Sequence, residues 1–264
     1  MELQGTPEAA TKRCPKLKVI IYRDTRKSVF FGRQQGLHSI LSLLDDSQIQ
    51  YLEYNMGLTV FNAAALSPEL DDMTDEQPYL LHRYDDLRIL RSANVFLTHP
   101  WGERLFRGAV DNKVLNSLDL YFPQPDLNER AGQTCLSYLA GWDWLLGAES
   151  IKALSLSNFD FGSEYSRDCP LPAFLKTFPN LETIELSSSH HTPEYVSSVA
   201  YNALKDIKTL RMLYVDVTGE ALYKLQAEAT RRGVRFSRRR DPENSTREWP
   251  VPLEPDRMLR TIET

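Results

Sequence analysis

The sequence predicts an α/β fold, a solenoid of about seven irregular strand–helix units with a parallel sheet on its concave face. Two observations favour this fold class. A short aliphatic frame recurs along the chain, and helix-like stretches fill most of the intervals between its copies. The 264 residues are 42% hydrophobic and 25% charged, which is the composition of a globular protein with a large core.

The frame has the form aliphatic-x-x-aliphatic-x-aliphatic, which places two apolar side chains of a short strand on the same side. The distance between the starts of consecutive copies varies from 28 to 38 residues. The shortest interval runs from residue 87 to residue 115, and the longest from residue 49 to residue 87. Each copy predicts one strand. Four clear copies begin at Leu115, Ile151, Leu181 and Leu210, and three looser copies begin at Leu17, Ile49 and Leu87.

Helix patterns follow the fourth and fifth frames. Residues 128–147 carry leucines at near-helical spacing, and Gly147 is placed to end the helix. Pro170 opens a short apolar segment that extends to Phe178, and proline is favoured in the first turn of a helix. We therefore expect one longer and one short helix in these two intervals.

The last two intervals contain the clearest helix patterns. Thr192, followed by a proline, predicts an N-cap and a helix that runs to about residue 206. Thr218 predicts the N-cap of a helix over 220–232, and Gly233 is placed to end it. Strand-sized and helix-sized patterns therefore alternate along the second half of the chain.

A strand followed by a returning helix, with the frame aliphatics on one side, is the unit of leucine-rich repeats. One unit cannot bury its apolar face alone, so units must stack to form a continuous core. A doubly wound α/β domain also alternates strands and helices and is the alternative. The chain has no G-x-G-x-x-G or phosphate-loop motif, which disfavours that alternative.

Residues 171–186, LPAFLKTFPNLETIEL, resemble the leucine-rich repeats of fungal F-box-like proteins, in which a short helix ends in Phe-Pro-Asn-Leu and leads into a strand. Residues 150–158 and 209–217 look similar. The resemblance implies a recognition role like that of a ubiquitin-ligase substrate receptor. The helical F-box, which binds the Skp1 adaptor in that family, has no counterpart before Leu17, so we do not expect Skp1 as a partner.

Composition and charge limit the class of protein. We expect a mobile N-terminal segment over 1–16, a repeat domain over 17–236 and an extended tail over 237–264. With 31 basic and 36 acidic residues, the net charge of −5 argues against a main role in nucleic-acid binding. No stretch has the length of a membrane span, and three cysteines form neither a disulfide framework nor a zinc motif. We therefore expect a cytoplasmic or nuclear protein.

No catalytic motif is present in the sequence. It lacks H-E-x-x-H, G-x-S-x-G and C-x-x-C, and neither Cys135 nor Cys169 has an evident base. His190 and His191 are adjacent, but neighbouring rings on a loop are poorly placed to share one metal ion. We expect neither an enzyme nor a bound metal or cofactor.

Function is therefore expected on a surface, and strand alternation selects that surface. If the frame aliphatics face inward, the residues between them face the concave side of the sheet. Tyrosines there give contact area at low entropy cost, and acidic residues favour a basic partner. The alternative is a polar face that only keeps the protein soluble. We predict that a protein or peptide binds through Tyr51, Arg91, Asp119, Tyr121, Glu185, Tyr214 and Asp216.

Six arginines lie close together near the end of the chain, at positions 231, 232, 235, 238, 239 and 240. One hypothesis makes them a nuclear-import or phosphate-binding patch, and hence the chain a nucleic-acid-associated protein. The other hypothesis, which we favour, is a helix C-terminus that accommodates cations, followed by a charged edge strand over 234–236.

Overall fold

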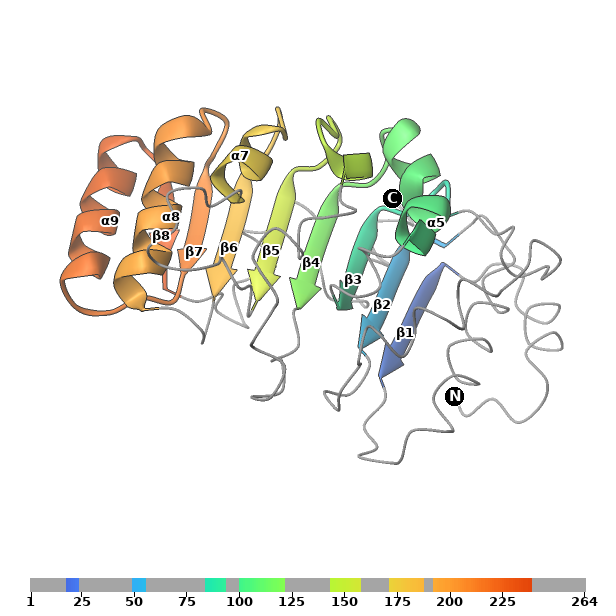
Figure 1. The fold of residues 1–264 in the computed structure, drawn as a ribbon, viewed down its shortest axis with the longest axis horizontal. Helices are drawn as coiled ribbons and strands as arrows, with labels where there is room; N and C mark the ends of the chain where they lie inside the picture. The colour runs from blue at the N-terminus through green and yellow to red at the C-terminus, as the bar shows by residue number, and fades with distance from the viewer. Residues whose placement is uncertain are drawn as a thin grey trace, which may run out of the picture.

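The computed structural model describes residues 18–23, 49–55, 84–93, 100–121, 143–157, 171–187 and 192–238. Within these residues eight strands form one sheet, in which every neighbouring pair is parallel. The strands lie side by side in sequence order (Figure 1). The predicted α/β class with a parallel sheet is thus confirmed. The predicted segments 1–16 and 237–264 lie outside the described residues, apart from residues 237 and 238.

The aliphatic frame predicts the positions of the strands accurately. Each of the first seven strands begins two residues after the first position of a frame copy, and the three looser copies form strands just as the clear ones do. The last strand lies one residue beyond the predicted edge strand. The bounds are β1 Val19–Arg23, β2 Tyr51–Asn55, β3 Ile89–Ala93, β4 Ser117–Tyr121, β5 Ala153–Ser157, β6 Thr183–Ser187, β7 Met212–Val215 and β8 Arg235–Ser237.

The register between strands keeps equal frame positions opposite one another. Leu118 pairs with Leu154, Leu154 with Ile184, and Ile184 with Leu213. All four side chains are fully buried, at 0% exposure. Because side chains alternate across a strand, this register gathers the frame aliphatics of β2 to β7 on one face of the sheet.

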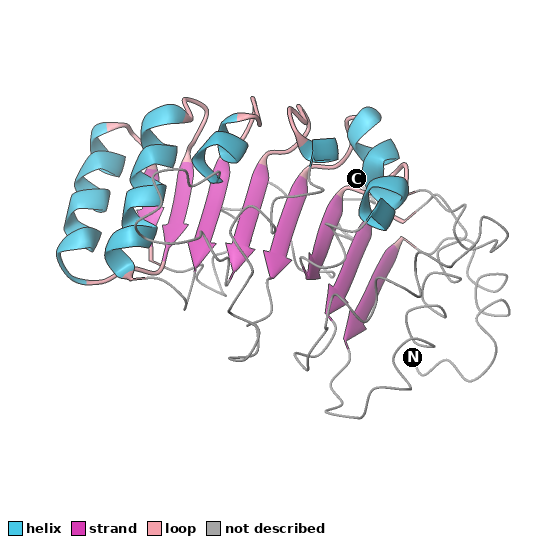
Figure 2. Ribbon diagram, in the orientation of Figure 1, coloured by secondary structure: helices cyan, strands magenta, loops and turns pink. Residues whose placement is uncertain are grey.

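The helices cover this aliphatic face. Their apolar side chains, such as Phe106, Leu175 and Leu204, belong to the same buried cluster as the frame aliphatics. Figure 2 shows the helices in one row alongside the row of strands, so the described residues form two layers with the core between them. The helical elements are α5 Pro100–Asp111, the 3-10 turn η2 Asp143–Leu145, α7 Leu171–Lys176, α8 Pro193–Asp206 and α9 Gly219–Arg231.

Local signals account for the ends of the last two helices. The hydroxyl of Thr192 accepts a hydrogen bond from the backbone N–H of Tyr195 at 3.3 Å, which confirms the predicted N-cap of α8. The prediction for Thr218 is wrong in one respect, because its side chain makes no capping hydrogen bond. Helix α9 begins instead at Gly219, whose φ of +67° lies in the left-handed region that favours glycine. Gly233, with φ of +69°, follows α9 as predicted.

Two helical elements differ from the sequence-based expectation. Helix α5 is not among the helices expected from the sequence, and its Phe106 ring stacks on Tyr84 and Trp144 at centroid distances of 5.5 and 6.4 Å. Of the helix predicted over 128–147, only residues 143–147 are described, and of these residues 143–145 form the single 3-10 turn η2. Gly147, with φ of +75°, follows this turn.

The order of the strands bears on the doubly wound alternative. In such a domain the strand order reverses at a switch point and helices cover both faces of the sheet. The described strands instead follow one another from β1 to β8 without reversal. None of the described helices has the length and apolarity needed to cross a membrane.

Candidate functional site

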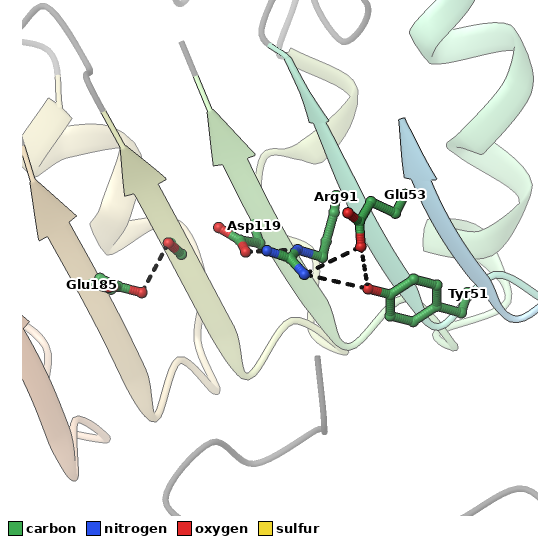
Figure 3. A network of polar contacts seen from close by, with 6 residues as sticks. Tyr51, Glu53, Arg91, Asp119 and Glu185 are labelled. Carbon is green, nitrogen blue, oxygen red and sulfur yellow. Dashed lines mark hydrogen bonds and ion pairs between the residues drawn. The ribbon is translucent and has the colours of Figure 1, made fainter. Parts of the chain in front are cut away.

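The sheet has a second face, which carries the side chains that alternate with the frame aliphatics. From β2 to β7, the register aligns six residues at the third strand position. Figure 3 shows that the side chains of Glu53, Arg91 and Asp119 point toward one another from three neighbouring strands. We call the aligned set the polar row: Glu53, Arg91, Asp119, Ser155, Glu185 and Tyr214.

Arg91 on β3 links carboxylates from both neighbouring strands. Its Nε lies 2.8 Å from Oδ2 of Asp119, and its Nη1 lies 3.2 Å from Oε2 of Glu53. The hydroxyl of Tyr51 donates a hydrogen bond to the same oxygen of Glu53 at 2.9 Å (Figure 3). The planar guanidinium directs its donors to several sides, so one arginine can bind a carboxylate on each neighbouring strand.

Burial and charge set the protonation of this network. Glu53 and Asp119 are only 5% and 8% exposed, and carboxylates so far from water need a cation beside them. Burial raises the pKa of Tyr51 well above its ordinary value, so the hydroxyl keeps its proton. Burial by itself lowers the pKa of Arg91, but the negative charge of Asp119 and the contacts with Tyr51 and Glu53 outweigh it and raise that pKa. Arg91 therefore stays charged.

The polar row continues toward β6 through a second contact. The hydroxyl of Ser155 donates a hydrogen bond to Oε2 of Glu185 at 3.1 Å. Ser155 is fully buried, whereas Glu185 is partly exposed. Within the row itself, three carboxylates stand against one guanidinium. The row therefore carries a surplus of negative formal charge, which favours a cationic ligand.

An apolar cluster lies on the same face beside the polar row. It contains Tyr51, Ile89, Ala153, Met212 and Tyr214, which are all at most 3% exposed. We expected Tyr51 and Tyr214 to offer contact area to a partner, but in this structure both tyrosines are buried. Both side chains belong to the apolar cluster, in which side chains of neighbouring strands pack against one another.

The structure brings most of the predicted site residues together. Tyr51, Arg91 and Asp119 form one contact network on β2, β3 and β4. Glu185 and Tyr214 lie opposite each other in the register of β6 and β7, further along the same row. Five of the seven predicted residues therefore share one face of the sheet.

The other two predicted residues lie at strand ends. Asp216 follows the last residue of β7 and forms an ion pair with Arg238 at 3.6 Å. Tyr121 is the last residue of β4, and its side chain lies outside the described part of the structure. The predicted set omits Glu53 and Ser155, although both occupy the same alternating position as Asp119. That shared position was the signal that could have identified them.

The described arginines of the 231–240 segment are engaged by the protein itself. Arg231 and Arg232 both donate hydrogen bonds to the carboxylate of Glu228, and Arg232 also binds the backbone carbonyl of Leu204 at the end of α8. Arg238 pairs with Asp216. These contacts support the interpretation as a helix C-terminus and a charged edge strand. Arg239 and Arg240 lie outside the described residues.

Glu228 provides a test of this arginine cluster by pH. The hydrogen bond from Arg231, assisted by Arg232, lowers the pKa of Glu228 from 4.5 to about 2. A depressed pKa stabilises the fold above the unfolded value, and this contribution is lost as pH falls from 4.5 toward 2. Glu228→Gln should therefore be less stable than the unchanged protein at pH 7 in urea unfolding, with a smaller difference at pH 3. A stability difference of equal size at pH 7 and at pH 3 would contradict the pairing of the Glu228 carboxylate with Arg231 and Arg232.

Chemistry of other kinds has little support among the residues that the structure describes. All five histidines and all three cysteines, including His190, His191, Cys135 and Cys169, lie outside them. The described ranges hold no group of three potential metal ligands from histidine, cysteine, aspartate and glutamate. No model of a known protein family matches the chain, and no curated protein matches its sequence.

Proposed function

We propose that the protein is a non-catalytic recognition module, a leucine-rich-repeat-like solenoid that binds a protein or peptide partner on the second face of its sheet. The polar row carries this proposal, because it aligns one set of polar side chains over six consecutive strands. Repeat proteins bind ligands along such continuous stripes, and Arg91 and Glu185 are the partly exposed members of this one. A role like that of a ubiquitin-ligase substrate receptor is one form of this function.

The repeat assignment draws support from the regularity of the strands. Seven copies of one sequence frame form seven strands with the same offset, and each strand contacts its sequence neighbours. A stack of units that bury a shared core in this way is the architecture of repeat proteins. In the proposed role the protein acts in the cytoplasm or nucleus, and Skp1 is not a partner.

The charge and length of the polar row define the partner. Three carboxylates against one guanidinium favour lysine or arginine side chains in the ligand. Six strands at a spacing of about 4.8 Å span roughly 24 Å, which equals about seven residues of extended peptide. An extended basic peptide or a basic loop of a protein therefore fits this face best.

The nucleic-acid hypothesis has weaker support. The negative charge of the polar row would repel phosphate groups. In addition, Arg231, Arg232 and Arg238 already bind carboxylates of the chain itself. No observation in the described residues favours it over protein recognition.

The proposal is tested by exchanging charge at one position of the row. The full chain is screened against an array of peptides about seven residues long, and the affinity of the best binders is measured by fluorescence anisotropy. We expect basic peptides to be selected and Glu185→Lys to weaken them at least tenfold, because the partly exposed carboxylate becomes a cation.

Glu194→Lys is the matched control, since it makes the same charge change at an exposed residue in the first turn of α8. It should leave the affinity unchanged. Selection of neutral or acidic peptides, or equal losses for the two variants, would overturn the assignment of the binding face.

A further inference from the structure

The residues of the polar row differ in their access to a ligand. From β3 to β6 the register places in line Arg91, Asp119, Ser155 and Glu185. The two middle residues, Asp119 and Ser155, are only 8% and 0% exposed. The side chain of Arg91 is 31% exposed, and Glu185 is also partly exposed. Along this part of the row a ligand therefore meets one cation and one carboxylate, which are carried by separate strands.

The guanidinium of Arg91 has donors that the network does not use. An arginine carries five N–H donors in a planar fork. Nε binds Asp119, and Nη1 binds Glu53 and Tyr51. In the described part of the chain, Nη2 has no hydrogen-bond partner. It is not one of the buried atoms without a partner there, so its two N–H groups are open to water or to a ligand.

The surroundings of Arg91 favour a neutral acceptor at this point. Carboxylates of Glu53 and Asp119 lie 3.2 and 2.8 Å from the guanidinium and already match its charge. A further carboxylate from a ligand would be repelled by these two. The carbonyl oxygen of an asparagine or glutamine side chain accepts the same hydrogen bond without adding a negative charge.

The distance along the row determines the spacing within the ligand. Three strand spacings separate Arg91 from Glu185, which is roughly 14 Å at about 4.8 Å each. Four residues of extended peptide cover roughly 13 Å at about 3.3 Å per residue. Because side chains alternate along an extended chain, residues four positions apart also point to the same side. One short ligand can therefore contact both residues.

We propose that Arg91 is a specificity-determining residue of the binding face, and that its Nη2 selects ligands with asparagine or glutamine four residues from the lysine or arginine that binds Glu185. The ligand is thus an extended segment in which one amide and one basic side chain point the same way. This inference rests on the proposed function and deepens it, because it adds a second recognition point to the basic one.

The test compares peptides that differ in one side chain. Seven-residue peptides with blocked ends carry a lysine and, four residues away in either direction, glutamine, methionine or glutamate, with serine elsewhere. Their affinity for the full chain is measured by fluorescence anisotropy. We expect the glutamine peptide to bind roughly tenfold tighter than the methionine peptide, which has a similar shape but no amide, because the hydrogen bond has a charged donor. The glutamate peptide should also bind more weakly than the glutamine peptide.

The Arg91→Lys variant separates the charge from the unused donors. Lysine keeps a positive charge beside Glu53 and Asp119, but its three donors only match the three oxygens that Arg91 already binds. The preference for glutamine over methionine should therefore disappear. Both peptides are measured on the same variant, so their affinity ratio does not depend on the fraction of folded protein. Arg211→Lys, at a 79% exposed side chain directly before β7, is the matched control and should keep the preference.

Three results would overturn the inference: equal affinities of the glutamine and methionine peptides for the unchanged protein, tighter binding of the glutamate peptide, or a glutamine preference that persists in Arg91→Lys. If Glu185→Lys weakens the lysine peptides but glutamine and methionine do not differ, the proposed function stands and this inference falls. If the glutamine preference depends on Arg91 but Glu185→Lys has no effect, the selection by Arg91 stands and the proposed basic partner falls. If none of the peptides binds, both fall.

Discussion

Replacement of Leu154 by alanine is expected to lower the free energy of unfolding by about 2 to 5 kcal/mol, through lost burial and the cavity left behind. Leu154 is 0% exposed and lies between Leu118 and Ile184 in the sheet register, under the helices. Ile184→Ala should have an effect in the same range, because Ile184 holds the same frame position one strand further. Urea unfolding followed by circular dichroism measures both values.

The matched control is Lys152→Ala, an exposed residue directly before β5. Its effect should stay within about 0.5 kcal/mol, as for most surface substitutions. Unchanged unfolding midpoints for both Leu154→Ala and Ile184→Ala would contradict a core shared by neighbouring strands.

Replacement of Arg91 by methionine is expected to lower the free energy of unfolding by roughly 2 to 4 kcal/mol. The substitution leaves Glu53 and Asp119, at 5% and 8% exposure, without the guanidinium between them. Loss of one partner of a fully buried pair costs roughly 3 to 5 kcal/mol. The expected value is smaller because the Arg91 side chain is 31% exposed, so water screens part of the remaining charge.

Two further variants separate charge from packing at this position. Arg211→Met removes an arginine that is 79% exposed and lies 3.7 Å from Glu182, so its effect should remain below about 1 kcal/mol. Adding Glu53→Gln and Asp119→Asn to Arg91→Met should recover part of the lost stability, because no uncompensated carboxylate remains. If the triple variant is no more stable than Arg91→Met alone, the network does not act through charge.

Much of the fold could be predicted because it depends on local periodicity. The frames at Leu17, Ile49 and Leu87 are weak matches, yet each gives a strand with the same offset as the clear frame at Leu115. Thr192 likewise fixes the start of α8 through a hydrogen bond to a residue three positions away. Signals of this range are contained in a few consecutive residues, so the sequence alone reveals them.

The candidate site could be predicted only in outline because its contacts join distant residues. Alternation assigns Asp119 to the second face, but Asp119 meets Arg91 only through the register of two strands. Periodicity also predicts which side of the sheet a tyrosine faces, but it does not predict whether other residues cover that side. For this reason the burial of Tyr51 and Tyr214 was not predicted. The alternate apolar residues Ile89 and Met212 were the available indication of a second apolar layer.

The parallel arrangement has a consequence for how this chain tolerates changes in length. Because every pair of strands is parallel, all eight strands end at the same edge of the sheet. Successive frames are separated by anything from 28 to 38 residues, yet the pairing keeps equal positions opposite one another. The frame spacing therefore differs by up to ten residues without any change in the strand register, so the sheet tolerates insertions and deletions in the connections between its strands.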